Sequence, residues 1–392
     1  MNIITHLEPH IEYIYEKLVY WRRYLHENPE LSFQESKTSG WIQQQLEEIG
    51  CQVKRCLHSN GLIVSIVGAH NGPVIALRAD MDGLPIQDEK SVAYASKVAN
   101  VMHACGHDGH TATLLAIAEF YINHKDELKG ERRLLFQPAE EVAPGGAAPM
   151  IAEGALQGVD VIYGVHLWTP LPYGKVSTRA GNFMSAVDDF HIEIQGLGGH
   201  GGMPHDTIDT IVVGSQFIQS LQTIVSRNVN PMNAAVVTVG SFQAGHANNI
   251  IAERCVIKGT VRTFDEQTRV LIQEKLENIL TTTCQMYGAT SSYNLKKGYP
   301  SVINDEVEAN RVLSVASDVM GANNVIVADP IMIAEDFSYY LQEVPGCFMF
   351  VGAGNAECQA TYAHHHPKFD IDERAMNNAI RMLVHVAEQY AN

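Results

Sequence analysis

The sequence predicts an α/β fold, in which a helix-covered, mostly parallel sheet is interrupted by a smaller unit of order β-α-β-β-α-β. Three observations support this prediction. Near-continuous Val, Ile and Leu runs alternate with helical patterns up to about residue 184, the pattern changes from about residue 187, and residues suited to chemistry occur on both sides of the changed region. We therefore expect the first unit to resume near residue 300.

The elements of the first unit follow from apolar spacing and from helix breakers. Residues 7–26 are predicted to form a helix because apolar side chains recur every three or four residues, and Pro29 then breaks the pattern. A second helix over 36–50 is expected to end at Gly50, which suits the left-handed C-cap. The remaining runs predict strands at 61–68, 73–80, 132–141 and 159–168, with a helix at 111–124.

The changed region contains four strand patterns and two helical patterns. They predict strands at 190–196, 234–243, 255–264 and 291–299, and helices at 207–225 and 266–288. This order is that of the ferredoxin-like unit. We place one domain at residues 1–184 and 298–392, and the inserted domain at 185–297.

Composition excludes several classes of protein. The chain of 392 residues is 46% hydrophobic and 18% charged, which argues against disorder, collagen and coiled coil and allows two or three domains. Its formal net charge of -17 repels phosphate backbones, so we expect no nucleic-acid partner. No run of 18 apolar residues and no basic-then-apolar N-terminus occurs, so we expect no membrane span and no signal peptide. Seven scattered cysteines favour a reducing, cytoplasmic location.

Potential metal ligands cluster at one strand-to-helix junction. Cys105, His107, Asp108 and His110 fall within six residues, and thiolate, imidazole and carboxylate are the ligands of zinc and similar metals. Such a junction is also where open α/β sheets place their active sites. A polar turn whose groups satisfy one another is the structural alternative.

Further candidates follow later strand patterns. Glu140 and Glu141 are adjacent carboxylates that repel each other unless a cation or a proton lies between them. His166 follows an apolar run, and three histidines stand together at 364–366. Each has a structural alternative: a solvated turn for the glutamates, a core histidine for His166 and a solvated loop for the triplet. The patterns HExxH, GxSxG, GxxxxGK[ST] and GxGxxG are absent.

At this level of detail the chain resembles a known family, the metal-dependent amidohydrolases. These include indoleacetyl-amino-acid hydrolases, hippurate hydrolase and N-acetyldiaminopimelate deacetylase, relatives of aminoacylases and carboxypeptidases. The stretches that carry the resemblance are LHENPELSFQE, LRADMDGLPIQDE, MHACGHDGHTA, LLFQPAEE, GVHLW, GGHGGMPH, GTVRTFD, AEDFSYYLQEVPG and HHHPKFDID. The resemblance implies a zinc-exopeptidase-like catalytic domain and an inserted ferredoxin-like lid through which the chain forms a homodimer.

The resemblance also implies a role for each candidate. Two divalent metals, of which Mn, Zn, Co and Ni remain open, would be bound by the residues that match the family's ligands: Cys105, His107, Glu141, His166 and His365. His365 is selected because the family's last ligand lies two residues before a proline. Glu140 would be the general base, and Asp82 would orient a ligand histidine.

Three residues of the inserted domain match positions that contact the substrate. His200 would support the oxyanion in the opposite subunit, and Asn249 and Arg262 would hold the substrate carboxylate. The reaction implied is hydrolysis of N-acyl-L-amino acids, a small-molecule substrate class. The sequence departs from the family at Ile333 and Ala334, where relatives have two glycines, which puts the substrate in question.

Three other functions remain open. A metallo-exopeptidase acting on dipeptides would need a site for a free amino group. A metal-binding or regulatory protein would keep the fold without turnover, although a complete ligand set with Glu140 argues against it. A hydrolase with Cys105 as nucleophile would leave the glutamate pair and His166 without a role.

Overall fold

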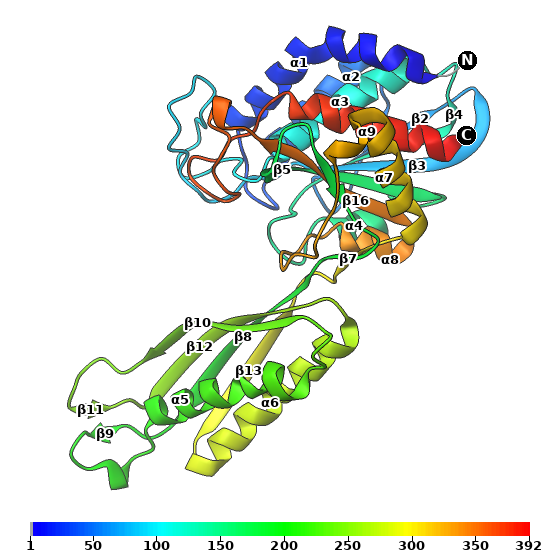
Figure 1. Cartoon of the computed structure of the whole chain (residues 1–392). Coiled ribbons are helices and arrows are strands. Elements are labelled where there is room, and N and C mark those ends of the chain that lie inside the picture. The colour runs from blue at the N-terminus through cyan, green and yellow to red at the C-terminus, as the bar shows by residue number, and fades with distance from the viewer. Residues whose placement is uncertain (1–2) are drawn as a thin grey trace. The chain divides into compact units, whose positions relative to one another are not determined.

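The computed structural model describes residues 3–392, coloured along the chain in Figure 1. The chain divides into two compact units. The first runs to Phe183 and continues over Val302–Asp329 and Asp336–Asn392, and the second is made of Met184–Ser301 and Pro330–Glu335. Among the described residues, no helix is long and apolar enough to span a bilayer. All seven cysteines are free thiols.

Two N-terminal helices begin the first unit, after a short 3₁₀ turn at Ile3–His6. They are α1 (Leu7–Glu27) and α2 (Ser36–Ile49). The periodic residues of α1 are all buried, as expected: Leu7, Ile11, Ile14, Leu18, Trp21 and Leu25. Helix α2 ends at Gly50, whose φ of 96° is the left-handed C-cap that the sequence predicts.

An eight-stranded sheet forms the centre of the first unit, in the order β1-β2-β4-β3-β5-β16-β6-β15. Its four central strands, β4, β3, β5 and β16, run parallel, whereas β1, β2 and β6 pair antiparallel with their inner neighbours. The strands are β1 (Val53–Arg55), β2 (Leu62–Val67), β3 (His70–Asp80), β4 (Lys129–Gln137), β5 (Val161–Pro172), β6 (Val176–Thr178), β15 (Val325–Val327) and β16 (Gly346–Gly354). The mostly parallel α/β architecture is therefore confirmed.

Helices cover this sheet, and α3 (His107–Asn123) and α9 (Ala375–Ala391) contact its central strands while α1 packs outside them (Figure 1). Helix α7 (Glu306–Met320) packs against α9 and β16. The shorter elements are α4 (Ala147–Ala152), α8 (Ser338–Glu343), the paired strands β7 (Gly181–Met184) and β14 (Val302–Asn304), and the 3₁₀ turns Ala322–Asn324 and Ala356–Cys358.

Two predicted boundaries near the candidate site are wrong. Helix α3 begins at His107, four residues before the expected start at 111, because Gly106 (φ 98°) turns the chain at its N-terminus. Strand β4 ends at Gln137 instead of continuing to 141. Ala139 has a left-handed φ of 55°, so Glu140 and Glu141 lie in a turn. Adjacent residues of an extended strand point to opposite faces of a sheet, and the turn removes that constraint from the two glutamates.

The second unit has the element order β-α-β-β-α-β. Its four-stranded antiparallel sheet has the order β10-β12-β8-β13, and β8 alternates buried and less buried residues as a one-sided strand does. The elements are β8 (Ala186–Gln195), α5 (Thr210–Leu221), β10 (Ala235–Ala244), β12 (Arg254–Thr263), α6 (Glu266–Tyr287) and β13 (Thr290–Lys297). Its small elements are β9 (Gly199–His200), β11 (Ile250–Ile251), a 3₁₀ turn at Pro204–Asp206 and a π-helical turn at Ile224–Asn228.

Candidate metal centre

Five predicted ligands come together at one edge of the large sheet, where the parallel strands β3, β4 and β5 approach their carboxyl ends. The Sγ atom of Cys105 lies 3.4 Å from Nε2 of His166. Glu141 lies between two histidines, 3.8 Å from Nε2 of His107 and 3.4 Å from Nε2 of His365. The donor atoms of Cys105, His107 and Glu141 all lie within 4.8 Å of one another.

Two buried atoms of this cluster favour a bound cation. Nε2 of His107 and Oε1 of Glu141 are buried and have no hydrogen-bond partner among the described residues. Buried polar atoms are nearly always paired, so such a pair of acceptors facing each other needs either a proton or a cation between them. A mixed thiolate, imidazole and carboxylate set is also the chemistry of a transition-metal site. The residues present therefore fit divalent metal ions.

Two candidate ligand histidines, His107 and His166, are oriented by bonds from their other ring nitrogen. Nδ1 of His107 lies 3.1 Å from a carboxylate oxygen of Asp82 and 3.0 Å from its carbonyl oxygen, and Nδ1 of His166 lies 3.0 Å from the carbonyl of Leu167. Both rings thus turn Nε2 toward the cluster, the arrangement that fixes metal-binding histidines. Asp82 also accepts from the Ser32 hydroxyl at 2.7 Å and from the backbone N–H of Glu141 at 3.1 Å.

The site concentrates negative charge in a buried volume. Burial opposes protonation of His107, but the carboxylates of Asp80, Asp82 and Glu141 outweigh it and raise its pKa to about 10. Burial also opposes ionisation of Asp82, yet its hydrogen bond with His107 lowers its pKa below the ordinary value. This field favours a positive charge at the position of the donors.

The same field argues against Cys105 as a free nucleophile. Burial, followed by the charges of Glu141 and Glu140, raises the pKa of the Cys105 thiol well above its ordinary value. A thiol in such surroundings is inert, whereas metal coordination would keep it as a thiolate. Cys105 is thus better suited to binding a cation than to attacking a substrate.

The other two candidates of the 105–110 group, His110 and Asp108, bond polar partners outside the donor cluster. His110 uses both ring nitrogens: Nδ1 lies 2.6 Å from Asp80, and Nε2 accepts the Leu167 N–H at 2.8 Å. Asp108 bonds Arg22 and His26, each at 2.8 Å. The structural alternative of mutually satisfied polar groups therefore describes His110 and only one oxygen of Asp108, because Oδ1 of Asp108 is buried without a hydrogen-bond partner among the described residues.

The histidine triplet divides in a similar way. His364 stacks on Trp168, with ring centroids 4.4 Å apart, and its Nε2 accepts the Thr169 N–H at 3.3 Å, while its Nδ1 lies 3.7 Å from Sγ of Cys105. His365 adopts a left-handed φ of 65° and turns Nε2 toward Glu141. The side chain of His365 is 52% exposed, so it lies at the mouth of the cluster.

A buried polar network behind the glutamates was missed in the sequence. Arg78 bonds Gln137 at 2.9 Å, Asp80 at 2.7 Å and Asp336 at 2.8 Å. Asp336 also accepts the N–H groups of Gly146 and Ala147, so it fixes the loop that follows Glu140. A signal was visible: Arg78 interrupts the apolar run PVIALRAD, and a charged residue within a buried strand requires partners.

The predicted substrate residues lie in the second unit. His200 and Asn249 are both exposed and lie close together, because β9 pairs with β11 and the N–H of Gly201 donates to the Asn249 carbonyl. Arg262 is half-buried near the other end of β12, where it pairs with Val187 of β8. Arg262 lies eight positions along this strand from Arg254, a distance of ~26 Å. One copy of this unit does not bring Arg262 to His200 and Asn249.

Comparison with known proteins agrees with this site. Residues 76–389 match the model of a protein family described as "Peptidase family M20/M25/M40". The N-acyl-L-amino acid amidohydrolase of Geobacillus stearothermophilus is 46% identical over 73% of this chain and 78% of its own length. The N-acetyl-L-cysteine deacetylase of Bacillus subtilis is 40% identical over 95% of this chain and 88% of its own.

A solved structure extends the similarity to three dimensions. The Bacillus subtilis YXEP protein, described as a dinuclear metal binding peptidase from the M20 family, is 35% identical and covers 97% of this chain and 99% of its own. The TM-score of the two structures is 0.83. With the donor cluster, these matches show that the chain belongs to peptidase family M20/M25/M40 and is a metal-dependent hydrolase.

Proposed function

We propose that this chain hydrolyses the amide bond of N-acyl-L-amino acids and releases a carboxylic acid and an amino acid. The carrying observation is that Glu140, a buried carboxylate, directly precedes Glu141 of the donor cluster. The names of two relatives, an N-acyl-L-amino acid amidohydrolase and an N-acetyl-L-cysteine deacetylase, support this substrate class.

The metal ligands proposed are Cys105, His107, Glu141, His166 and His365. His365 is preferred to His364 because it directs Nε2 toward Glu141 and stands two residues before Pro367, although Nδ1 of His364 also faces Cys105. When bound, the two cations would polarise the amide carbonyl and acidify a water molecule. Zn, Mn, Co and Ni all suit this mixed ligand set.

Glu140 is the proposed general base and acid. Its carboxylate takes one proton as the water oxygen bonds to the carbonyl carbon, and it returns that proton to the amide nitrogen as the carbon–nitrogen bond breaks. The second water proton stays on the acyl group, so the products are a carboxylic acid and a free amine, which exchange that proton with solvent afterwards. Asp82 positions His107 and, through the Glu141 N–H, the turn that carries both glutamates.

Recognition of the substrate is proposed to require two copies of the chain. Asn249 lies near the start of strand β12 and Arg262 near its end, ~26 Å away. If both residues hold the same substrate carboxylate, they must therefore come from different copies of the chain. A homodimer through the second unit would meet this requirement, and the partner's copy would then also present His200 to the oxyanion. That unit is accordingly proposed as the lid and dimerisation domain.

A peptidase remains the second candidate, because the family is named for peptidases and the YXEP protein is described as one. The two functions differ in the substrate: an N-acyl amino acid is acylated at its amino group, whereas a dipeptide has a free N-terminal amino group. In this chain Ile333 and Ala334 stand before Glu335, and Ile333 is 48% exposed, so these side chains are available to narrow a substrate pocket.

The deciding experiment measures amino-acid release from N-acyl amino acids and from dipeptides. Protein treated with EDTA is assayed as it is and after addition of Mn, Zn, Co or Ni. We expect cleavage of acyl amino acids that is lost on chelation and restored by metal. Cleavage of dipeptides alone would support the peptidase, and activity that persists after complete removal of metal would contradict the assigned site.

A further inference from the structure

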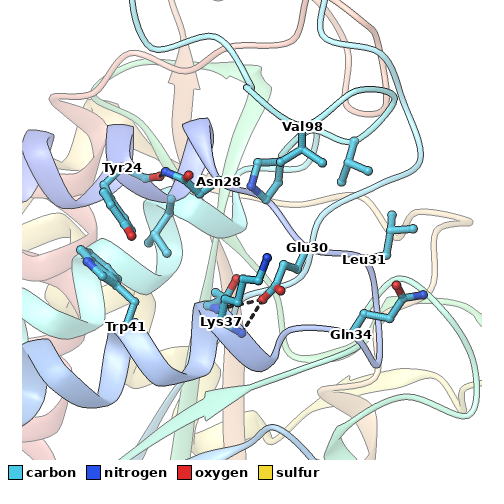
Figure 2. A pocket seen from close by; sticks show the side chains of 12 residues that line it. Tyr24, Asn28, Glu30, Leu31, Gln34, Lys37, Trp41 and Val98 are labelled. Carbon is cyan, nitrogen blue, oxygen red and sulfur yellow. Dashed lines mark hydrogen bonds between the residues drawn. The ribbon is translucent and has the colours of Figure 1, made fainter.

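The residue that precedes helix α2 does not cap it with its side chain. Glu35 occupies the N-cap position, yet its side chain makes no hydrogen bond to the first turn of α2. Glu30 takes that role, since its Oε2 accepts the N–H groups of Lys37 and Thr38, each at 2.8 Å. Figure 2 shows these two bonds at the edge of a pocket between α1 and α2. The carboxylate of Glu35 is therefore available for another purpose.

That carboxylate is fully buried and bonds the turn that carries the glutamate pair. Oε1 of Glu35 accepts the N–H of Ala139 at 2.8 Å and that of Phe33 at 2.9 Å. Oε2 accepts from the Asn60 side chain at 3.0 Å, and Glu35 is 0% exposed. A buried carboxylate costs free energy unless it is fully hydrogen-bonded, and here these three donors satisfy it.

The backbone conformation is unusual at both residues whose N–H groups donate to Glu35. Phe33 has a φ of 66° and Ala139 a φ of 55°, left-handed values that residues other than glycine rarely adopt. Such conformations persist only where the surrounding structure holds them, and they concentrate at functional sites. Glu35 bonds the N–H of both residues.

We propose that Glu35 is a positioning residue for Glu140 and Glu141. It fixes Ala139, which directly precedes Glu140, while Ser32 of the same segment holds Asp82, which in turn accepts the N–H of Glu141. The segment 32–35 therefore ties the turn on both sides of Glu140. This inference rests on the proposed roles of the two glutamates.

The test compares Glu35→Ala with a matched control, Glu30→Ala. Both variants remove a carboxylate that accepts two backbone N–H groups, but the Glu30 side chain bonds only α2, whereas that of Glu35 also bonds Ala139. We expect Glu35→Ala to lower kcat about 10- to 100-fold and metal affinity about 10-fold, with a smaller change in KM. Glu30→Ala should lower Tm and leave both quantities unchanged. Glu35→Gln, which keeps an acceptor oxygen for Ala139, should recover most of the loss.

Metal affinity is measured by titrating Zn²⁺ into the metal-free full-length protein, so it needs no substrate. If the parent protein cleaves no acyl amino acid, the proposed function fails while this measurement still decides the role of Glu35. Equal metal affinity and equal kcat in the Glu35→Ala and Glu30→Ala proteins would overturn the proposal. If Glu35→Ala does not fold, Asn60→Ala should give a smaller loss of metal affinity, and no loss would overturn it.

Discussion

The candidate metal ligands of the first unit and the candidate substrate residues of the second unit differ in one respect. A single chain brings the metal ligands together but does not bring all of the substrate residues together. In the first unit, candidate donors from α3, β5 and three loops converge in a buried volume, and His107 and His166 are each oriented by a carboxylate or a carbonyl. In the second unit, His200 and Asn249 are exposed, and Arg262 lies at the other end of β12. The candidate metal centre is thus preorganised within a single chain, whereas we propose that the substrate contacts require a second copy of the chain.

The largest effect should separate the two adjacent glutamates. Glu140→Gln removes the proposed base but no ligand, so we expect kcat to fall about 10³-fold while metal affinity is retained. Glu141→Gln, the matched variant, removes a ligand and should lose bound metal. Steady-state kinetics and metal titration of both proteins test this, and full turnover by Glu140→Gln would refute the mechanism.

The next largest effect is expected at the candidate substrate residues of the second unit. His200→Ala should lower kcat about 10²-fold, the typical loss for one oxyanion donor. If His200 acts on the partner copy, mixing His200→Ala with Glu140→Gln protein should restore activity at about a quarter of all sites, because half the dimers are mixed and each has one intact site. Activity is assayed after subunit exchange. No recovery in demonstrably mixed dimers would place His200 in its own chain's site or outside catalysis.

A smaller loss is expected from the residue that orients His107. Asp82→Asn keeps acceptors for Ser32 and Glu141 but removes the charge beside Nδ1 of His107. Metal affinity should fall about 10- to 100-fold. Ser32→Ala is the control, since it removes one bond to Asp82 and should have a weaker effect. An Asp82→Asn protein with parental metal affinity would show that the centre does not depend on this bond.

The smallest effect concerns stability of the first unit in acid. Burial disfavours the Asp88 carboxylate, but hydrogen bonds from His26, Ser96 and Lys90 outweigh it and lower its pKa to about 2. Because the folded pKa lies below the unfolded value of about 3.9, this stabilisation is complete above that value and is lost as pH falls toward 2. Asp88→Asn should lose on the order of 1 kcal/mol at neutral pH and show a flatter decline of Tm below pH ~4. Thermal unfolding across pH measures both.

The sequence anticipated the elements better than it anticipated the bonds between them. Apolar periodicity placed α1 and α2 because their spacing reflects burial directly. It placed the start of α3 too late, since His107 and Asp108 are buried polar residues that a hydrophobic pattern does not count. Nothing in the spacing could show that His110 uses both nitrogens, because its partners Asp80 and Leu167 are distant in sequence.

Distance in sequence also explains why the buried polar network around Arg78 was not predicted. Arg78 and Asp336 are separated by 258 residues, so only the folded sheet brings them together. The C-terminal elements β16 and α9 were also not identified individually, although their unit was expected to resume near residue 300. Motifs compensated in part: they placed Cys105, His107, Glu141 and His166 at one sheet edge, where the structure has them.

The stacking of His364 on Trp168 has an optical consequence. This indole lies 4.4 Å from the His364 ring, whose Nδ1 faces Sγ of Cys105, whereas Trp21 is buried against Gln45 and Trp41 stacks on Tyr24. A cation that withdraws charge from the Cys105 sulfur alters the field at one of the three tryptophans directly. The chain therefore carries its own fluorophore beside the candidate metal centre, and we expect tryptophan emission to follow metal entry in the unlabelled protein.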